Sequence, residues 1–419
     1  MRERPGHSRR RLDLVLDAAP TTAASGSAPG AKDPGVEAGS AELAALAEQA
    51  GLKRVAIVSW RDLDDPEAGG SELHAHEVAT RWAGAGIDVV MRTSSVAGRA
   101  ALVERGGYRA VRRSGRYGVF LTGPADIAGG HLGPLDGLVE IWNGMPFLSP
   151  LWSRLPRVVF LHHVHGVMWQ MALPVPLARA GRVLEARLAP PLYHASRIVT
   201  LSESSRNEVV SLPGVRPGRV SVVPPGIDAR YSPGGRRAER PLVVAIGRLV
   251  PVKNFPRLLS ILARVHERMP ELESVIVGEG RERSGLQSKL RELGAEGYIS
   301  LPGRVSADEL VDLYRRAWVV ASTSTREGWG LTVSEAAACA TPAVATRIPG
   351  HVDAIDDGVT GMLADSDDEF EHKLETILRD PMLRRRLGRA ASERVAPLTW
   401  EATARGTLAA LVRAARKDG

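Results

Sequence analysis

Apolar and polar positions follow one another along the chain in an order that occurs twice. The first copy starts with an apolar run of strand type, RVAIVSW (54–60), and continues through a polar loop to a helical pattern at 71–86. In that pattern Leu73, Val78 and Trp82 recur at helical spacing, and we expect Ser71 to cap its start. A second apolar run, IDVVMRTS (87–94), follows. This order predicts a strand, a helix and a second strand of one parallel sheet.

The second copy begins about 190 residues later. PLVVAIGR (241–248) is of strand type, FPRLLSILARVHERM (255–269) is helical, and ESVIVGEG (273–280) is again of strand type. The stretch that precedes this copy is rich in Pro, Gly and Arg, which is typical of a linker. The chain therefore divides into two α/β domains, which we place at 53–225 and 241–398, joined by a linker at 226–240.

Both ends of the chain differ from these domains. We expect 1–52 to be a disordered tail, because 21–40 contains too few large apolar residues to pack. Five arginines stand within the first eleven residues, and we interpret them as solvated rather than as a site for nucleic acid or anionic lipid. The last segment, 399–419, is helical in pattern.

Composition excludes several classes of protein. The 419 residues are 44% hydrophobic and 25% charged, with a net charge of +7, as in a globular protein. One cysteine, Cys339, excludes a disulfide scaffold and a multi-cysteine zinc site, and we expect it to be a small buried residue. No apolar run approaches the ~20 residues that span a bilayer. Asp13 and Asp17 interrupt the only N-terminal apolar stretch, so we expect a cytoplasmic protein.

The richest stretch in candidate chemistry is STSTREGWGLTVSEAAACATPAVAT (322–346). Glu327 and Glu335 flank seven residues that include two glycines, and a helix is predicted to start near Thr332. Glycines let backbone amides approach a ligand, and the positive end of a helix favours an anion such as a diphosphate. The alternatives are structural: Thr332 and Glu335 also fit a capping box, and Glu327 could be an exposed loop acid.

A second cluster lies in GRLVPVKNFPRLL (247–259). Arg248 and Lys253 stand five residues apart between a predicted strand and a predicted helix. Two cations at the carboxyl end of a parallel strand can neutralise a leaving diphosphate without a metal ion. The alternative is that they are ordinary surface cations.

Three histidines, His162, His163 and His165, follow the predicted strand RVVF (157–160). Such a cluster suggests zinc, but no carboxylate at ligand spacing and no cysteine accompanies it, so we expect no metal site. Two segments stay open between alternatives. The arginine-rich stretch 104–120 fits a solvated β-hairpin better than a membrane-surface patch, and 140–152, with Asn143, fits either an acceptor surface or a core strand and turn.

Together these segments resemble the retaining GT-B glycosyltransferases of family four, the glycosyl transferases group 1. The family's Glu-x7-Glu element is matched by Glu327 and Glu335, and its Gly-Arg…Lys-Asn element by 247–254. VVPPGID (222–228), VGEGRER (277–283) and 301–324 resemble further elements of the family, in the same order. The resemblance runs from about Arg54 to the C-terminus, with Trp329 for the commoner Phe and Ala340 for the usual Gly.

The resemblance implies a role for each matching position. Arg248 and Lys253 would bind the donor diphosphate, Glu327 would contact the donor sugar and Glu335 the ribose. Gly330 and the backbone at Leu331 and Thr332 would bind phosphate, and Arg304 and Val305 would lie at the base. Gly69 and Gly70 would close over the diphosphate from the first domain, and His163 or His165 would lie beside the sugar.

It also implies the fold and the activity. We expect two Rossmann-like domains facing each other across a cleft, the first holding the acceptor site and the second the nucleotide sugar, with 399–419 crossing back to the first domain. The activity would be hexosyl transfer with retention, without cofactor or metal, from a UDP- or GDP-sugar to a hydroxyl of a glycan, lipid-linked or small-molecule acceptor. Peripheral contact with the inner face of a membrane stays open, and no nucleic acid is expected as partner. A sugar-nucleotide epimerase or hydrolase of the same fold is the first alternative, and a basic nucleic-acid-binding protein the second.

Overall fold

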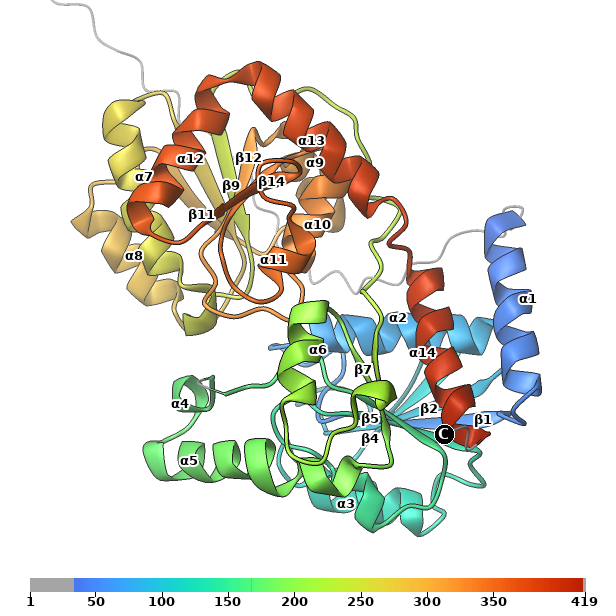
Figure 1. The fold of residues 1–419 in the computed structure, drawn as a ribbon. Helices are drawn as coiled ribbons and strands as arrows, with labels where there is room; N and C mark the ends of the chain where they lie inside the picture. The colour runs from blue at the N-terminus through green and yellow to red at the C-terminus, as the bar shows by residue number, and fades with distance from the viewer. Residues whose placement is uncertain (1–33, 167, 417–419) are drawn as a thin grey trace, which may run out of the picture.

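A computed structural model describes residues 34–416 except Val167, and Figure 1 shows two α/β domains stacked one on the other. The first five arginines of the chain and the rest of 1–33 lie outside the described residues. The two domains are built on separate, mainly parallel sheets, so the expected fold class is confirmed.

The first sheet has the strand order β3-β4-β2-β1-β5-β6-β7-β8, and only the β3–β4 pair is antiparallel. Its strands are β1 (Arg54–Val58), β2 (Asp88–Thr93), β3 (Leu102–Arg105), β4 (Tyr108–Arg112), β5 (Gly137–Ile141), β6 (Arg157–Phe160), β7 (Arg197–Thr200) and β8 (Val220–Val222). The helices around it are α1 (Pro34–Glu48), α2 (Gly70–Gly84), α3 (Val119–Ala128), α4 (Met168–Ala172), α5 (Val175–Val183) and α6 (Glu203–Val210). Short turns of helix are η1 (Ser149–Leu151), η2 (Leu184–Leu188), η3 (Pro190–Tyr193) and η4 (Pro217–Arg219).

The second sheet is parallel throughout, in the order β11-β10-β9-β12-β13-β14. Its strands are β9 (Leu242–Ile246), β10 (Glu273–Val277), β11 (Ile299–Gly303), β12 (Val319–Ser322), β13 (Ala343–Thr346) and β14 (Gly361–Ala364). The helices around it are η5 (Pro251–Lys253), α7 (Phe255–Arg268), α8 (Arg283–Glu292), α9 (Ala307–Arg316), α10 (Leu331–Ala338), α11 (His351–Ala354), α12 (Asp367–Arg379) and α13 (Pro381–Val395). After a break, α14 (Trp400–Ala415) follows.

Strand β9 shows why this sheet forms. Val243 and Ala245 pack into the core beneath α7 and α12, whereas Leu242 and Val244 pack into the core beneath α9 and α10. Successive strand residues point to opposite faces, so an unbroken apolar run suits a strand with helices on both sides.

Helix α14 joins the two halves by packing on the first domain, against α1, α2 and β6. The indole of Trp82 in α2 donates to the carbonyl of Ala404 at 3.0 Å, and Arg81 pairs with Glu401 at 2.8 Å. At its start, the backbone N–H of Ile227 in the linker donates to the carbonyl of Leu398 at 2.9 Å. The linker and the last helix therefore form one double connection between the domains.

Two local expectations are wrong. Residues 34–48, which we placed in the disordered tail, form α1, and Leu43 and Ala47 are buried against the first core. Helix α2 begins one residue before Ser71, with Gly69 as its N-cap, because Glu72 accepts the backbone N–H of Gly69 at 2.7 Å. A carboxylate three residues into the helix thus replaces the expected serine cap.

The expected hairpin at 104–120 is present as β3 and β4, but its arginines are not free in solvent. Arg112 is buried and pairs with Asp62 at 2.7 Å, and it also pairs with Asp64. The other four arginines of the stretch, at 105, 109, 113 and 116, likewise pair with carboxylates. The segment is therefore a neutralised network and not a basic patch. Cys339 is buried, as expected.

Candidate active site

The predicted site residues meet where the carboxyl ends of the two sheets face each other. Arg248 follows β9, the loop with Glu327 follows β12, the histidines follow β6, and Gly69 lies in the loop between β1 and α2. Loops at the carboxyl edge of a parallel sheet converge, so residues far apart in sequence are brought together. In the structure, the loops at the carboxyl edges of both sheets lie together in this way.

Lys253 and Glu327 form an ion pair at the centre of this region. The Lys253 Nζ lies 2.5 Å from Glu327 Oε1, which also accepts from the Ser324 hydroxyl at 2.7 Å. Burial raises the pKa of Glu327, but Lys253, His351 and the Ser324 hydroxyl together outweigh burial, and the pKa lies below its usual value. Glu327 is therefore a carboxylate at neutral pH, and the alternative of an exposed loop acid is wrong, since its side chain is 16% exposed.

Arg248 reaches across to the first domain. Its guanidinium donates to the carbonyl of Glu67 at 3.0 Å. A Cβ at position 69 would lie 3.2 Å from the Arg248 Nε, so glycine lets the guanidinium lie against the loop. Burial and the nearby Arg61 lower the pKa of Arg248, which stays a cation because its usual pKa is far above neutrality.

The start of α10 lies opposite Gly70. Gly330 is the N-cap, with φ of 105°, a backbone conformation that favours glycine. The first N–H groups of α10, at Leu331 and Thr332, form the positive end of that helix. A Cβ at position 70 would lie 3.1 Å from the Leu331 side chain, so the first-domain glycine loop covers this helix start.

Glu335 has a different partner from the one a capping box would give. Its carboxylate accepts from the Tyr314 hydroxyl at 2.6 Å, and the N-cap is Gly330, so the capping interpretation is wrong. Burial raises the pKa of Glu335 to about 7. The side chain lines a pocket of about 210 Å³ together with Asp228 and Trp400.

Arg304 and Val305 follow β11, further along the same edge. The Arg304 guanidinium donates to the carbonyl of Pro66 at 2.7 Å, whereas Val305 is partly buried. The loop at 61–69 is thus contacted by two arginines of the second domain, Arg248 and Arg304.

The histidines separate into different positions. A Cβ at position 328 would lie 3.5 Å from Nδ1 of His163, so His163 faces the loop of Glu327. His165 stacks beside His163, with ring centroids 5.0 Å apart, and lies against Gly144. His162 points away and pairs with His74 at 3.2 Å. Burial lowers the pKa of His162 and of His165 to about 4, and lowers that of His163 well below its usual value.

No group of three His, Cys, Asp or Glu side chains within residues 34–416, Val167 excepted, is arranged to hold a metal ion. The acidic loop residues Asp62 and Asp64 pair with arginines instead.

Sequence reasoning missed a polar contact between the domains beside the site. Arg326 pairs with Glu208 of α6, and the Ser204 hydroxyl bonds to Asp353 of α11. The N–H of Gly350 donates to Ser204 at 3.0 Å. These partners are more than 100 residues apart, and no local pattern in the sequence could have paired them.

Solved structures share this two-domain architecture. Sucrose-phosphate synthase from Thermosynechococcus elongatus superposes with a TM-score of 0.72 over 84% of this chain and 96% of that one, at 20% identity. HepE of Anabaena, solved in complex with UDP and glucose, gives 0.65 over 83% and 95%, at 19% identity. The fold is therefore that of the GT-B glycosyltransferases.

The sequence places the chain within a family of that class. Residues 231–394 match the family described as glycosyl transferases group 1, and residues 68–231 match glycosyltransferase family 4. A D-inositol 3-phosphate glycosyltransferase of Kribbella flavida is 30% identical over 86% of this chain and 95% of its own length. The protein belongs to the family four, group 1 glycosyltransferases, and is a glycosyltransferase.

Proposed function

We propose that the protein is a retaining glycosyltransferase that moves a hexosyl group from a UDP- or GDP-sugar to a hydroxyl group without a metal ion. The observation that carries the proposal is the Lys253–Glu327 pair, held beside Arg248 under the glycine loop of the first domain. A nucleotide-sugar donor is further supported by HepE, whose structure contains UDP and glucose.

The chemistry follows from the charges at the site. Arg248, Lys253 and the positive end of α10 can stabilise the diphosphate as negative charge develops on it. Glu327 lies beside Lys253, where a carboxylate can accept from sugar hydroxyls. In the mechanism we propose, the bond between sugar and diphosphate breaks first, and the departing phosphate oxygen takes the proton of the attacking hydroxyl on the same face of the sugar. His163, which is neutral at pH 7, would bond to the sugar from the first domain.

A turnover screen tests the donor and the reaction class. The full-length protein is incubated with UDP-, GDP- and ADP-sugars, with and without a panel of acceptors, and nucleotide release is measured. We include inositol phosphates in the panel because the Kribbella flavida relative is named for such an acceptor. Release that depends on an acceptor supports transfer. Release without any acceptor would favour the epimerase or hydrolase, and salt-sensitive binding of DNA or RNA without release would favour the nucleic-acid-binding protein.

Glu335 makes the affinity for the donor depend on pH. We expect UDP-glucose, whose diphosphate does not titrate near neutrality, to bind more tightly as pH rises through about 7, because the ionised carboxylate accepts from ribose hydroxyls. Glu335→Gln should bind it more weakly, with little pH dependence. Calorimetry between about pH 5 and about pH 8.5, on either side of neutrality, compares the affinities of wild type and Glu335→Gln for UDP-glucose. A Glu335→Gln protein that binds as wild type does would contradict the ribose assignment.

The same group predicts a pH dependence of stability. The folded pKa of Glu335 is about 7 against an ordinary 4.5, so the folded protein holds a proton that the unfolded chain releases. Its contribution to the free energy of unfolding therefore falls as pH rises from about 4.5 to about 7. Glu335→Gln should accordingly be more stable relative to wild type at pH 8 than at pH 5, by chemical denaturation. An unchanged difference would show that Glu335 does not titrate in this range.

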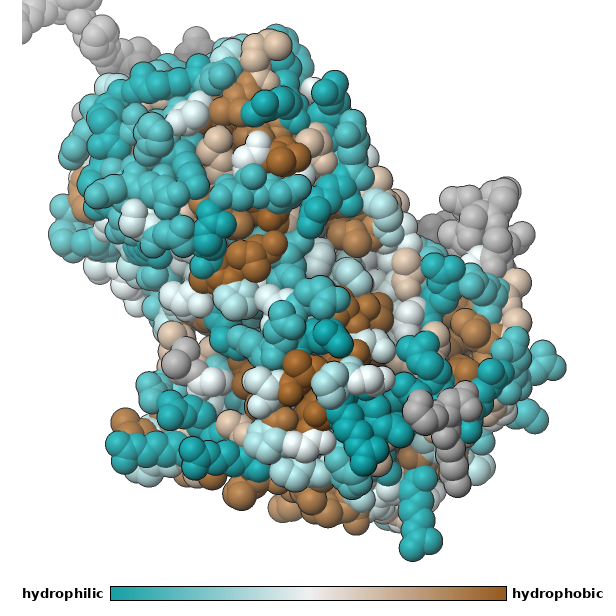
Figure 2. Space-filling model, viewed as in Figure 1, coloured by the Kyte–Doolittle hydropathy of each residue, from teal (hydrophilic) through white to brown (hydrophobic). Residues whose placement is uncertain are grey.

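For the membrane contact, α5 is a better candidate than the hairpin arginines, which are paired. Val175, Leu177, Val183 and Leu188, on α5 and the turn after it, are all large apolar residues more than 40% exposed. Apolar side chains gather along the lower edge of the first domain in Figure 2, where α5 and α3 lie in Figure 1. Three exposed arginines accompany them: Arg179, Arg182 and Arg187. We propose that this surface, which we call the α5 face, binds anionic lipid. No helix among the described residues is long and apolar enough to cross a membrane.

Vesicle sedimentation tests the α5 face. Reversing Arg179, Arg182 and Arg187 to Glu should lower binding to phosphatidylglycerol-containing vesicles by about 10²-fold or more, since each cation near such a surface contributes about 1 kcal/mol and the new carboxylates are repelled by it. Arg385, Arg386 and Arg389 on α13 of the second domain, reversed together, give the same change in net charge as a control. Equal losses in both triple variants would contradict a specific α5 face.

A further inference from the structure

The turn η2, which continues α5, carries a buried carboxylate that contacts the loop at 162–166 after β6, which we call the histidine loop. The Glu185 side chain is 1% exposed, and its oxygens accept from the backbone N–H of His165 at 2.8 Å and of Gly166 at 3.1 Å. The indole N–H of Trp169 donates to it at 2.9 Å. All three donors belong to the segment between β6 and the end of α4.

The helix is built to receive this segment. η2 is a single π-helical turn, and such turns redirect side chains and are frequent at functional sites. One turn earlier, a Cβ at Gly181 would lie 2.6 Å from the ring of Trp169, so the indole lies directly on the α5 backbone. Gly181 and Glu185 are four residues apart and share one face of the helix.

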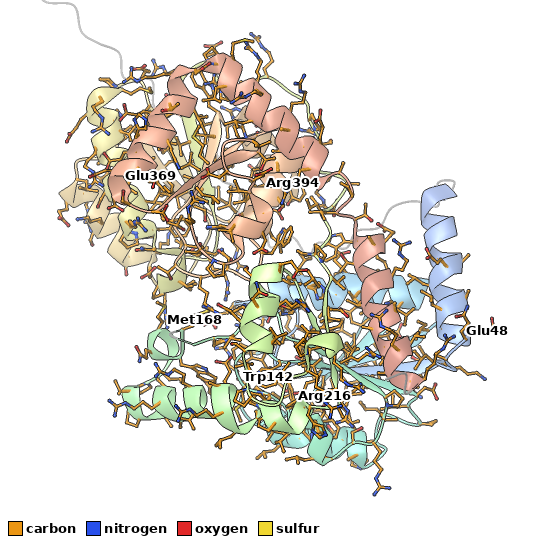
Figure 3. All side chains as sticks on the ribbon, in the orientation of Figure 1. Glu48, Trp142, Met168, Arg216, Glu369 and Arg394 are labelled. Atoms are coloured by element: carbon orange, nitrogen blue, oxygen red, sulfur yellow. The ribbon has the colours of Figure 1, made fainter. Side chains whose placement is uncertain are left out.

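The same segment is also fixed from the second domain. Arg281 donates to the carbonyl of Met171 at 2.7 Å, and α4 contacts η5, the turn that carries Lys253. Figure 3 shows Met168, the first residue of α4, on the side of the first domain nearest the second. The histidine loop is therefore held between a helix of the first domain and the donor-binding edge of the second.

A buried carboxylate is costly unless its oxygens are satisfied, and an apolar side chain would pack α5 at lower cost. The carboxylate makes directional contacts that an apolar side chain cannot make. Its two oxygens accept three N–H hydrogen bonds, which fix the backbone of the histidine loop in one orientation. Through His165, which stacks on His163, this orientation passes to the ring that faces the loop of Glu327.

We propose that Glu185 is a positioning residue: it holds the backbone of the loop at 163–166 so that His163 faces the donor sugar across the cleft. The role rests on the proposed glycosyl transfer, but the contact between Glu185 and the loop can be tested without it.

The kinetic test uses Glu185→Gln, which keeps the shape but replaces one acceptor oxygen by a donor. With the donor that the screen selects, we expect kcat to fall roughly tenfold to 10²-fold, the scale of a small misplacement of a reacting group. The Kd of UDP should stay within about twofold, because its proposed charged partners lie in the second domain and Glu185 does not contact the loop of Gly69 and Gly70. A fall in UDP affinity equal to the fall in kcat would overturn the proposal.

A double-mutant cycle separates positioning from a general loss of structure. In the background of His163→Ala, Glu185→Gln should cause little further loss of kcat if it acts through His163. Losses that simply multiply would overturn the proposal. The control is Asp126→Asn: Asp126 of α3 is also buried in the first domain, and its carboxylate accepts from Arg92 at 2.7 Å and from Arg113 at 2.8 Å. It should lower the melting temperature similarly but leave kcat within about twofold.

NMR of ¹⁵N-labelled histidines tests directly whether Glu185 positions the rings of His163 and His165. Glu185→Gln should shift or broaden those of His163 and His165 and leave that of His351 unchanged, and unchanged His163 and His165 signals would overturn the proposal. If wild type transfers no sugar, the proposed function fails, while this spectrum still decides the contact. If Glu185→Gln does not fold, Trp169→Phe removes one of the three donors. It should then shift the same two signals, and their constancy would count against the proposal.

Discussion

Replacing Lys253 by alanine is expected to lower turnover by about 10²-fold or more, the usual scale for loss of one group that stabilises developing charge. Lys253 is one of two cations at the proposed diphosphate position, and it also holds Glu327 ionised at 2.5 Å. Without the ammonium, the main interaction that opposes burial would be lost, and the pKa of Glu327 would rise. Both effects reduce the rate. Initial rates at saturating donor, with acceptor present, measure the loss.

Lys289→Ala is the matched control. Lys289 lies on α8 and pairs with Glu292 on the surface, so its removal should leave turnover unchanged. Melting curves of both proteins show whether Lys253→Ala is folded. Wild-type turnover in a folded Lys253→Ala protein would contradict the assignment of the donor site.

The second large effect is structural, at the double connection between the domains. A Cβ on Gly226 would lie 2.2 Å from the backbone N and 2.5 Å from the Cα of Trp400, so no side-chain movement can make room. Gly226→Ala must displace the start of α14 or the linker. We expect a loss of about 3 kcal/mol or more in the free energy of unfolding, at the upper end for overpacking.

Gly285→Ala is the comparison. Gly285 lies in α8, and a Cβ there would meet nothing within 4 Å. Alanine in a helix is favoured over glycine by up to about 1 kcal/mol, so this variant should melt at or above the wild-type temperature. Differential scanning calorimetry of both variants decides the point. Equal melting temperatures would show that the contact of Gly226 with Trp400 yields easily.

The sequence could predict the two domains because the evidence for them is local. The apolar run at 242–246 reads as a buried strand, and β9 is one, with helices on both faces. The two elements of charged residues, 247–254 and 327–335, could be recognised for the same reason: each is a short segment with fixed spacing. The structure brings them together at the Lys253–Glu327 pair.

What the sequence could not predict depends on distant partners. The helix at 34–48 has few large apolar residues, and it is stabilised by packing on α14, more than 350 residues away. Glu335 fits a capping box by its spacing to Thr332, but its carboxylate instead accepts a hydrogen bond from Tyr314 of α9. The sequence also could not show which of the three histidines faces the cleft. His163 does, because its ring lies against Gly328 of the other domain.

One time course tests both retention of the anomeric configuration and the independence of the reaction from a metal ion. NMR follows the donor selected by the screen and its acceptor in the presence of excess EDTA, and the one-bond coupling between the anomeric carbon and its proton reports the configuration of donor and product. We expect a product with the anomeric configuration of the donor, formed at the rate seen without EDTA. A product of opposite configuration, or a reaction that EDTA stops and added magnesium restores, would contradict it.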